Sequence, residues 1–230
     1  MNIIVCDKNY SIDEKVSNIL EALFHIKKYK NHSLAFRSGC KSGVCGSCAI
    51  KVDGIERLAC KTPIKENIAI KPISNLPIIK DLIVDIENQK EYLKSSKAYL
   101  EEYNDTKISK EDEKKIDIES NCILCNSCFS SCPVYDLNLN FKGPFALTRV
   151  FRYIEDKKEK DKKSKIDIIQ DSGIWNCTLC GNCDMVCPAN IQIKNKIIHL
   201  RNLSAQFGYN DPNFANFNDN LNFGFNPNGF

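Results

Sequence analysis

Twelve of the thirteen cysteines fall into three groups of four, and cysteines grouped in this way are typical of metal sites. The first group has the spacing C-x4-C-x2-C, with a fourth cysteine further along the chain, which is typical of a plant-type [2Fe–2S] cluster. Glycines fit such a loop, because a backbone that wraps a cluster needs positive φ angles. Zinc is the weaker alternative, since it prefers paired C-x2-C knuckles. The predicted ligands are Cys40, Cys45, Cys48 and Cys60.

The second and third groups both have the spacing C-x2-C-x2-C-x3-C-P, the run of two-cluster ferredoxins. In these ferredoxins the fourth cysteine of each run binds the other cluster, so the runs exchange one ligand. The repeat also predicts an internally duplicated helical domain. One predicted [4Fe–4S] cluster is held by Cys122, Cys125, Cys128 and Cys187. The other is held by Cys132, Cys177, Cys180 and Cys183, and is predicted to be [4Fe–4S] with [3Fe–4S] as the alternative.

No catalytic residue is expected in this chain. The three histidines, His25, His32 and His199, are scattered, and the sequence contains no recognisable nucleophile, base or flavin fingerprint. Three clusters in series would carry single electrons between a two-electron centre and a distant donor or acceptor. Catalysis is therefore expected to belong to another subunit.

The composition is that of a globular protein with two modest cores. The chain has 230 residues, of which 43% are hydrophobic and 27% charged, and its net charge of +3 is too small to indicate nucleic acid as a partner. The longest apolar runs are far shorter than the roughly 20 residues that cross a bilayer. The N-terminus lacks a basic region followed by a long apolar run, so no secretory signal is expected and the protein is predicted to stay in the cytoplasm.

The expected fold class is α+β, in which a β-grasp plant-type ferredoxin domain over residues 1–78 precedes an all-α two-cluster domain. Strands are predicted at 3–5, 48–52, 55–58 and 68–70, with a tight Asp53-Gly54 turn between the second and third. Apolar residues from Val16 to Ile26 recur at helical spacing and predict a helix with one buried face. The thirteenth cysteine, Cys6, is interpreted as a small buried hydrophobe on the first strand.

The helical domain is predicted over residues 79–204, because apolar residues follow a helical pattern from about Asp81 onward. The charge run at 157–163 has both signs interleaved and is interpreted as a solvated helix face or loop. Residues 205–230 form a low-complexity tail rich in Asn, Phe and Gly. Two interpretations of this tail stay open: a flexible end, or a strap whose phenylalanines lie on a partner subunit.

Over nearly its whole length the chain resembles the iron–sulfur subunit of the succinate dehydrogenase and fumarate reductase family. The motifs that carry the resemblance are Ser38-Gly39-Cys40, Val44-Cys45-Gly46-Ser47-Cys48, Leu58-Ala59-Cys60-Lys61-Thr62, Pro77 to Asp85, Cys122-Ile123-Leu124-Cys125, Gly143-Pro144 and Trp175-Asn176-Cys177-Thr178. The resemblance implies a partner flavoprotein subunit with FAD and a membrane-anchor subunit. It also implies a peripheral position on the cytoplasmic side of the cell membrane, as part of a complex.

Cys180 departs from the usual pattern of that family. In most members the matching position is not cysteine and the third cluster is [3Fe–4S], whereas Cys180 completes a set of four thiolates here. Members with this cysteine resemble a branch whose membrane-side subunit is often a cysteine-rich protein related to heterodisulfide reductase. The expected function is therefore electron relay between an FAD subunit and a membrane-side quinone or thiol/disulfide subunit of a fumarate reductase or succinate dehydrogenase complex.

Two other functions stay open. The chain could serve a different flavoprotein oxidoreductase, of the glycolate oxidase or thiol-driven fumarate reductase type. It could also be a free two-domain ferredoxin that carries electrons in solution. The Phe-rich tail favours a bound subunit, because a free carrier would expose a small polar docking face.

Overall fold

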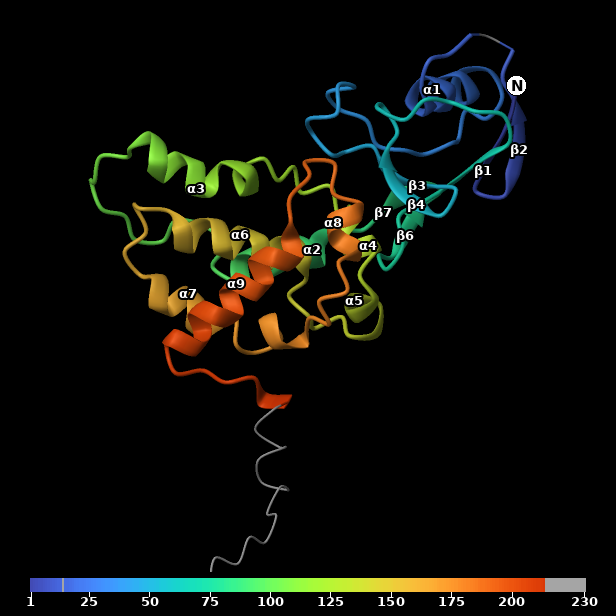
Figure 1. The fold of residues 1–230 in the computed structure, drawn as a ribbon. Helices are drawn as coiled ribbons and strands as arrows, with labels where there is room; N and C mark the ends of the chain where they lie inside the picture. The colour runs from blue at the N-terminus through green and yellow to red at the C-terminus, as the bar shows by residue number, and fades with distance from the viewer. Residues whose placement is uncertain (14, 214–230) are drawn as a thin grey trace, which may run out of the picture.

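The computed structural model describes residues 1–13 and 15–213, which form an N-terminal domain of strands and one helix and a C-terminal domain of helices (Figure 1). The predicted α+β class is confirmed: a ferredoxin-like strand domain precedes a helical domain. The part of the predicted tail from residue 214 onward lies outside the described residues. The two interpretations of the tail, a flexible end or a strap on a partner subunit, therefore both stay predictions.

The N-terminal domain is a five-stranded sheet with the order β2-β1-β5-β3-β4. The central pair β1 and β5 is parallel, and the remaining neighbours are antiparallel. Apolar side chains of the sheet pack with one face of the helix α1 into a single core, which explains the helical spacing seen in the sequence. The elements are β1 (Asn2–Val5), β2 (Lys8–Ser11), α1 (Ile19–Tyr29), β3 (Ala49–Val52), β4 (Ile55–Leu58) and β5 (Ile68–Lys71).

Two tight hairpin turns shape this sheet. The predicted turn between β3 and β4 is confirmed, and its residues Asp53 and Gly54 have φ angles of 48° and 86°. A second turn at Cys6 and Asp7, with φ angles of 47° and 63°, joins β1 to β2. The interpretation of Cys6 as a buried strand residue is therefore wrong: it is half-buried and lies in the turn, just after β1 ends.

The connection between the domains is a short hairpin of β6 (Ile78–Lys80) and β7 (Ile83–Val84), followed by the helix α2 (Glu87–Ser95). The predicted helical pattern is therefore wrong between residues 81 and 86. Asp81 has a φ of 48° in the turn of this hairpin, and its carboxylate accepts a hydrogen bond from the Ala35 N–H at 2.8 Å. Leu82 packs into the core of the N-terminal domain, because the hairpin returns the chain to that side.

The helical domain is built around α6, most of whose residues are buried. Helices α2, α3, α4, α7 and α9 all pack on α6, and an aromatic group of Phe129, Tyr135 and Phe145 lies at the centre of the core. The elements after α2 are α3 (Lys110–Ser120), α4 (Ser127–Ser130), α5 (Pro133–Leu137), α6 (Pro144–Glu155), α7 (Lys162–Ile168), the 3₁₀ helix η1 (Ile174–Asn176), α8 (Asn182–Met185) and α9 (Ile193–Gln206).

The interpretation of the charge run at 157–163 as solvated is wrong for one of its residues. Glu159 is buried, and its carboxylate lies 3.1 Å from the ammonium of Lys165, which is also fully buried. The Lys165 ammonium donates further hydrogen bonds to the carbonyl oxygens of Lys97 and Tyr99. This ion pair is stable inside the domain because its remaining hydrogen-bonding capacity is satisfied.

No helix within the described residues is both long enough and apolar enough to cross a bilayer.

Candidate iron–sulfur centres

The first cysteine site lies in the irregular loop between α1 and β3, together with Cys60 after β4. The backbone N–H groups of Ser42 and Val44 donate to the Cys40 sulfur at 3.4 and 3.3 Å. On the inner side of the loop, the sulfur atoms of Cys48 and Cys60 lie 3.4 Å apart, close enough to bind one iron atom together. The structure thus brings together all four cysteines that were predicted for this site, in two neighbouring pairs: Cys40 with Cys45, and Cys48 with Cys60.

The two sides of this loop differ in their electrostatics. Hydrogen bonds from the side chain and backbone of Ser42 and the backbone of Val44 lower the pKa of the Cys40 thiol to about 6. Donors that point at a sulfur favour its thiolate form, which is the form that binds iron. Burial raises the pKa of the Cys48 thiol to about 11. Cys40 is therefore prepared for negative charge, while Cys48 becomes charged only when metal displaces its proton.

A second set of four cysteines lines a cavity between the start of α4 and the segment before α9. Its walls are otherwise mostly apolar and include Phe145, Ile191 and Ile193. The fourth cysteine comes from the other run, more than fifty residues away in sequence, as the crossed grouping predicts. The cysteines of this second site are Cys122, Cys125, Cys128 and Cys187.

A third set lines a separate cavity between α5, α8 and α9. Val134, Phe141 and Ile197 supply apolar walls, and Lys194 also lines the cavity. Here too one cysteine comes from the opposite run. The cysteines of this third site are Cys132, Cys177, Cys180 and Cys183.

The two cysteine runs have the same backbone conformation at matching positions. Leu124 and Leu179, each just before the second cysteine of its run, have φ angles of 52° and 57°. Asn126 and Gly181, each just after that cysteine, have φ angles of 66° and 84°. A left-handed backbone conformation is uncommon for residues other than glycine. Its recurrence at matching positions indicates that both loops curl around their cavities in the same way. Cys180 therefore occupies in its loop the position that Cys125 occupies in the other.

Burial dominates the chemistry of the thiols in the helical domain. It raises the pKa of Cys122, Cys125, Cys132 and Cys177, and raises those of Cys128 and Cys183 furthest. Two cations oppose this effect: Arg149 on α6 lowers the pKa of Cys122, and Arg201 on α9 lowers that of Cys177. Iron binds thiolates, so loading these sites releases protons.

The residues present fit iron–sulfur clusters. Each site offers four cysteine sulfurs, which is the ligand set of [2Fe–2S] and [4Fe–4S] clusters. The walls of the two inner cavities are otherwise largely apolar. Within residues 1–13 and 15–213, no three His, Cys, Asp or Glu side chains are arranged to hold a single metal ion.

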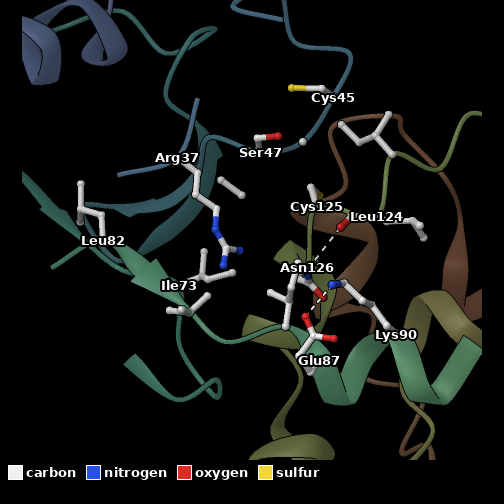
Figure 2. Close-up of a pocket in the computed structure, with 15 residues that line it drawn as sticks. Arg37, Cys45, Ser47, Ile73, Leu82, Glu87, Lys90, Leu124, Cys125 and Asn126 are labelled. Carbon is white, nitrogen blue, oxygen red and sulfur yellow. Dashed lines mark hydrogen bonds and ion pairs between the residues drawn. The ribbon is translucent and has the colours of Figure 1, made fainter. Parts of the chain in front are cut away.

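The first and second sites meet where the two domains touch. A cavity of ≈ 430 Å³ lies at this boundary. Figure 2 shows Cys45 and Ser47 on one side of it and Leu124, Cys125 and Asn126 on the other. Ile123 and Cys125 of the helical domain pack against the core of the N-terminal domain. The second site is therefore in direct contact with the loop of the first.

A set of polar contacts joins the domains beside α4. The amide of Asn75 donates to the carbonyl oxygens of Phe129, Ser130 and Cys132, at distances between 3.0 and 3.3 Å. The Ser130 hydroxyl donates to the buried carboxylate of Glu56 at 2.6 Å. These contacts tie the segment between Cys128 and Cys132 to the N-terminal domain.

Sequence reasoning missed the residues that support the sites without binding iron. Arg201 donates to the carbonyl oxygens of Ile174 and Cys177, at 2.8 and 2.6 Å, and so fixes the entry to the third site. Asn75 and Glu56 act from the other domain. An arginine on a helix and an asparagine after a strand carry no motif, so only the folded structure reveals their partners.

Comparisons with known proteins agree with the two-domain order. Residues 5–91 match the 2Fe-2S iron-sulfur cluster binding domain, and residues 119–191 match the 4Fe-4S dicluster domain. The fumarate reductase iron-sulfur subunit of Haemophilus influenzae is 31% identical over 196 residues, covering 76% of this chain and 77% of that protein.

Archaeal relatives are longer. A fumarate reductase (CoM/CoB) subunit of Methanothermobacter marburgensis is 33% identical over 205 residues, which cover 87% of this chain but 41% of that protein. An uncharacterized iron-sulfur protein of Methanocaldococcus jannaschii is 33% identical over 220 residues, covering 93% and 44%. The chain thus spans less than half the length of these relatives.

Among solved structures, a chain of the Mycobacterium smegmatis Sdh1 complex in the apo form has the same fold. The TM-score is 0.79 at 22% identity, and the match covers 89% of this chain and 92% of that one.

Proposed function

Since the chain belongs to the family of fumarate reductase and succinate dehydrogenase iron–sulfur subunits, we propose that it relays electrons within a complex of this kind. A member of this family is one subunit among several. We assign the [2Fe–2S] cluster to Cys40, Cys45, Cys48 and Cys60. The two cubane-type clusters are assigned to the second and third cysteine sites, and both are [4Fe–4S].

The observation that carries this proposal is the order and exposure of the three sites. The first site touches the second at the domain boundary, and the second and third sites exchange ligands. Cys40 of the first site and Cys180 of the third are exposed, whereas each cysteine of the second site is buried or half-buried. A relay needs this arrangement, with an accessible centre at each end and a protected one between them.

When bound, the clusters supply one-electron chemistry, with potentials set by their type, charge, hydrogen bonds and exposure. The chain's own residues set those conditions. Ser42 and Val44 direct N–H groups at the Cys40 sulfur and stabilise negative charge there. Phe145, Ile191 and their neighbours keep water from the second site. Arg201 holds the carbonyl oxygen of Cys177 and places a positive charge beside the third site.

We place the partner subunits at the two exposed ends. We assign an FAD-containing flavoprotein subunit to the end at Cys40, and a membrane anchor or a cysteine-rich membrane-side subunit to the end at Cys180. The protein would then lie peripherally on the cytoplasmic side of the cell membrane. Catalysis takes place on the flavoprotein, so the isolated chain is expected to turn over neither succinate nor fumarate.

A second candidate is the thiol-driven branch of the same chemistry. Cys180 favours it, because this cysteine lines the third cavity and gives the third site four thiolates. The relative from M. marburgensis belongs to a fumarate reductase whose name specifies CoM and CoB, which are thiols. In this version the membrane-side partner passes electrons to or from a thiol/disulfide pair instead of a quinone.

Native purification tests the proposal. A tagged chain taken from gently solubilised membranes should bring down a protein with bound FAD, and the purified assembly should reduce fumarate or oxidise succinate. A quinol and a dithiol are then offered as alternative electron donors for fumarate reduction. Activity with the quinol supports the first candidate, and activity with the dithiol supports the second. A monomeric chain that carries its clusters without any flavin would contradict both and support a free ferredoxin.

A further inference from the structure

Gly46 is the point where the loop of the first site touches the loop of the second. It directly follows Cys45, and a Cβ atom built on it would lie 2.8 Å from the Cβ of Cys125 and 2.9 Å from the carbonyl oxygen of Ile123. Figure 2 shows Cys45 and Ser47, on either side of this residue, across the boundary from Leu124 and Cys125. A ligand of one site is thus one residue away from backbone contact with a ligand of the next.

No side chain fits at Gly46 without a shift of its own loop or of the backbone at Ile123 and Cys125. Separations under 3.0 Å are not seen for real Cβ atoms, and the atoms that would be met belong to the backbone and to the Cβ of Cys125. These atoms cannot turn away as the end of a flexible side chain would. The φ angle of Gly46 is also 70°, a conformation that glycine adopts without strain.

We infer that Gly46 is a positioning residue that sets the separation between the first and second clusters, an inference that rests on the proposed function. In the exchange that this contact serves, one electron passes between the iron atoms of the two sites. One site is oxidised as the other is reduced, and no proton or covalent bond changes. Electron tunnelling weakens steeply with distance, so a contact without a side chain favours fast exchange.

The sequence offers a matched control in Gly54. It has a φ of 86°, so an alanine there carries the same kind of backbone strain, yet no described atom lies within 4 Å of its Cβ position. Gly54 belongs to the turn between β3 and β4. Comparing Gly46→Ala with Gly54→Ala therefore separates the loss of the close contact from backbone strain.

The measurement is the electron-paramagnetic-resonance relaxation of the reduced [2Fe–2S] cluster in the full, anaerobically loaded chain. It is recorded with the second cluster oxidised and again with it reduced. In the wild type and in Gly54→Ala, reduction of the second cluster should accelerate the relaxation, because two nearby spins interact. In Gly46→Ala, with both clusters present by iron analysis, most of this acceleration should be lost. Acceleration equal to that of the wild type would overturn the inference.

Two further arms keep the test decisive if Gly46→Ala does not load its first site. The wild type alone contradicts the inference if its relaxation does not respond to the second cluster. Asn75→Gly releases three carbonyl groups of the helical domain and suits the positive φ of Asn75. It leaves the Gly46 contact in place, so the acceleration should stay close to that of the wild type. Loss of the acceleration in this variant would show that other contacts set the separation and would contradict the inference. A chain without clusters would instead refute the proposed function itself.

Discussion

The Ser130 hydroxyl donates a 2.6 Å hydrogen bond to the buried carboxylate of Glu56 across the domain boundary. The same Ser130 oxygen accepts a hydrogen bond from the Ser74 N–H at 2.7 Å, so one hydroxyl connects two segments of the N-terminal domain to α4. The only other described cation or donor near this carboxylate is the Lys51 ammonium, at 3.6 Å. Ser130 is therefore, together with Asn75, one of the residues that hold the two domains together.

Ser130→Ala should lower the free energy of unfolding by about 1–3 kcal/mol, because a buried charged acceptor loses its donor. Urea unfolding followed by circular dichroism measures the change. Ser95→Ala is the control, since the Ser95 hydroxyl is exposed and makes only a 3.5 Å contact. Equal effects of the two substitutions would show that the Glu56 contact does not stabilise the joint.

Lys165→Met should destabilise the protein strongly. The ammonium of Lys165 and the carboxylate of Glu159 are both fully buried, so removing the lysine leaves an uncompensated charge in the core. The expected loss is about 3–5 kcal/mol by thermal or urea unfolding. Lys163→Met, which breaks the exposed pair with Asp167, should cost at most about 1 kcal/mol. A Lys165→Met protein as stable as Lys163→Met would mean that the buried pair contributes little.

Cys187→Ser should damage the second cluster, although Cys187 belongs to the run that begins at Cys177. The reason is that Cys187 lines the cavity of Cys122, Cys125 and Cys128. Resonance spectra of the reduced protein report each cluster separately. Cys45→Ser is the control and should remove only the [2Fe–2S] signal, because that site lies in the other domain. Loss of the third cluster alone in Cys187→Ser would show that the ligands are not crossed.

Cys180→Ala should convert the third cluster from [4Fe–4S] to [3Fe–4S]. Cys180 lines that cavity, and one iron lacks a thiolate without it. A [3Fe–4S] resonance should appear in the oxidised variant and the potential of the site should change, whereas the oxidised wild type should show little such signal. A strong [3Fe–4S] signal in anaerobic wild-type protein, unchanged by the substitution, would contradict the assignment of Cys180.

Much of the fold was predictable where local sequence decides structure. The Asp53-Gly54 turn holds two positive φ angles that this pair favours, so the β3–β4 hairpin was visible in advance. The turn between β1 and β2 has the same type of geometry at Cys6 and Asp7, but Cys seldom adopts a positive φ angle and no glycine follows to signal the turn. The strand β2 was therefore missed, and the mostly exposed residues of Lys8–Ser11 gave no alternating pattern to reveal it.

The cysteine groups were predictable because cluster ligands are set by spacing within a run. The structure adds what spacing cannot contain, namely contacts between segments far apart in sequence. Gly46 against Cys125 joins two domains, and Glu159 looks like part of a solvated charge run until the fold buries it against Lys165. From about Asp81 the sequence predicts helix instead of the second half of the β6–β7 hairpin, because the apolar residues there suit either period over so short a span.

Quantitative iron and acid-labile sulfide analysis of the anaerobically purified full chain tests the central claim, that one chain holds three clusters in three separate sites, most directly. Twelve cysteine ligands in these sites predict about ten iron atoms per chain, and about nine in Cys180→Ala. The resonance spectra of the reduced protein should account for one [2Fe–2S] and two cubane-type clusters. A fully folded chain that saturates at about six iron atoms or fewer, whatever the reconstitution conditions, would contradict the three-site account.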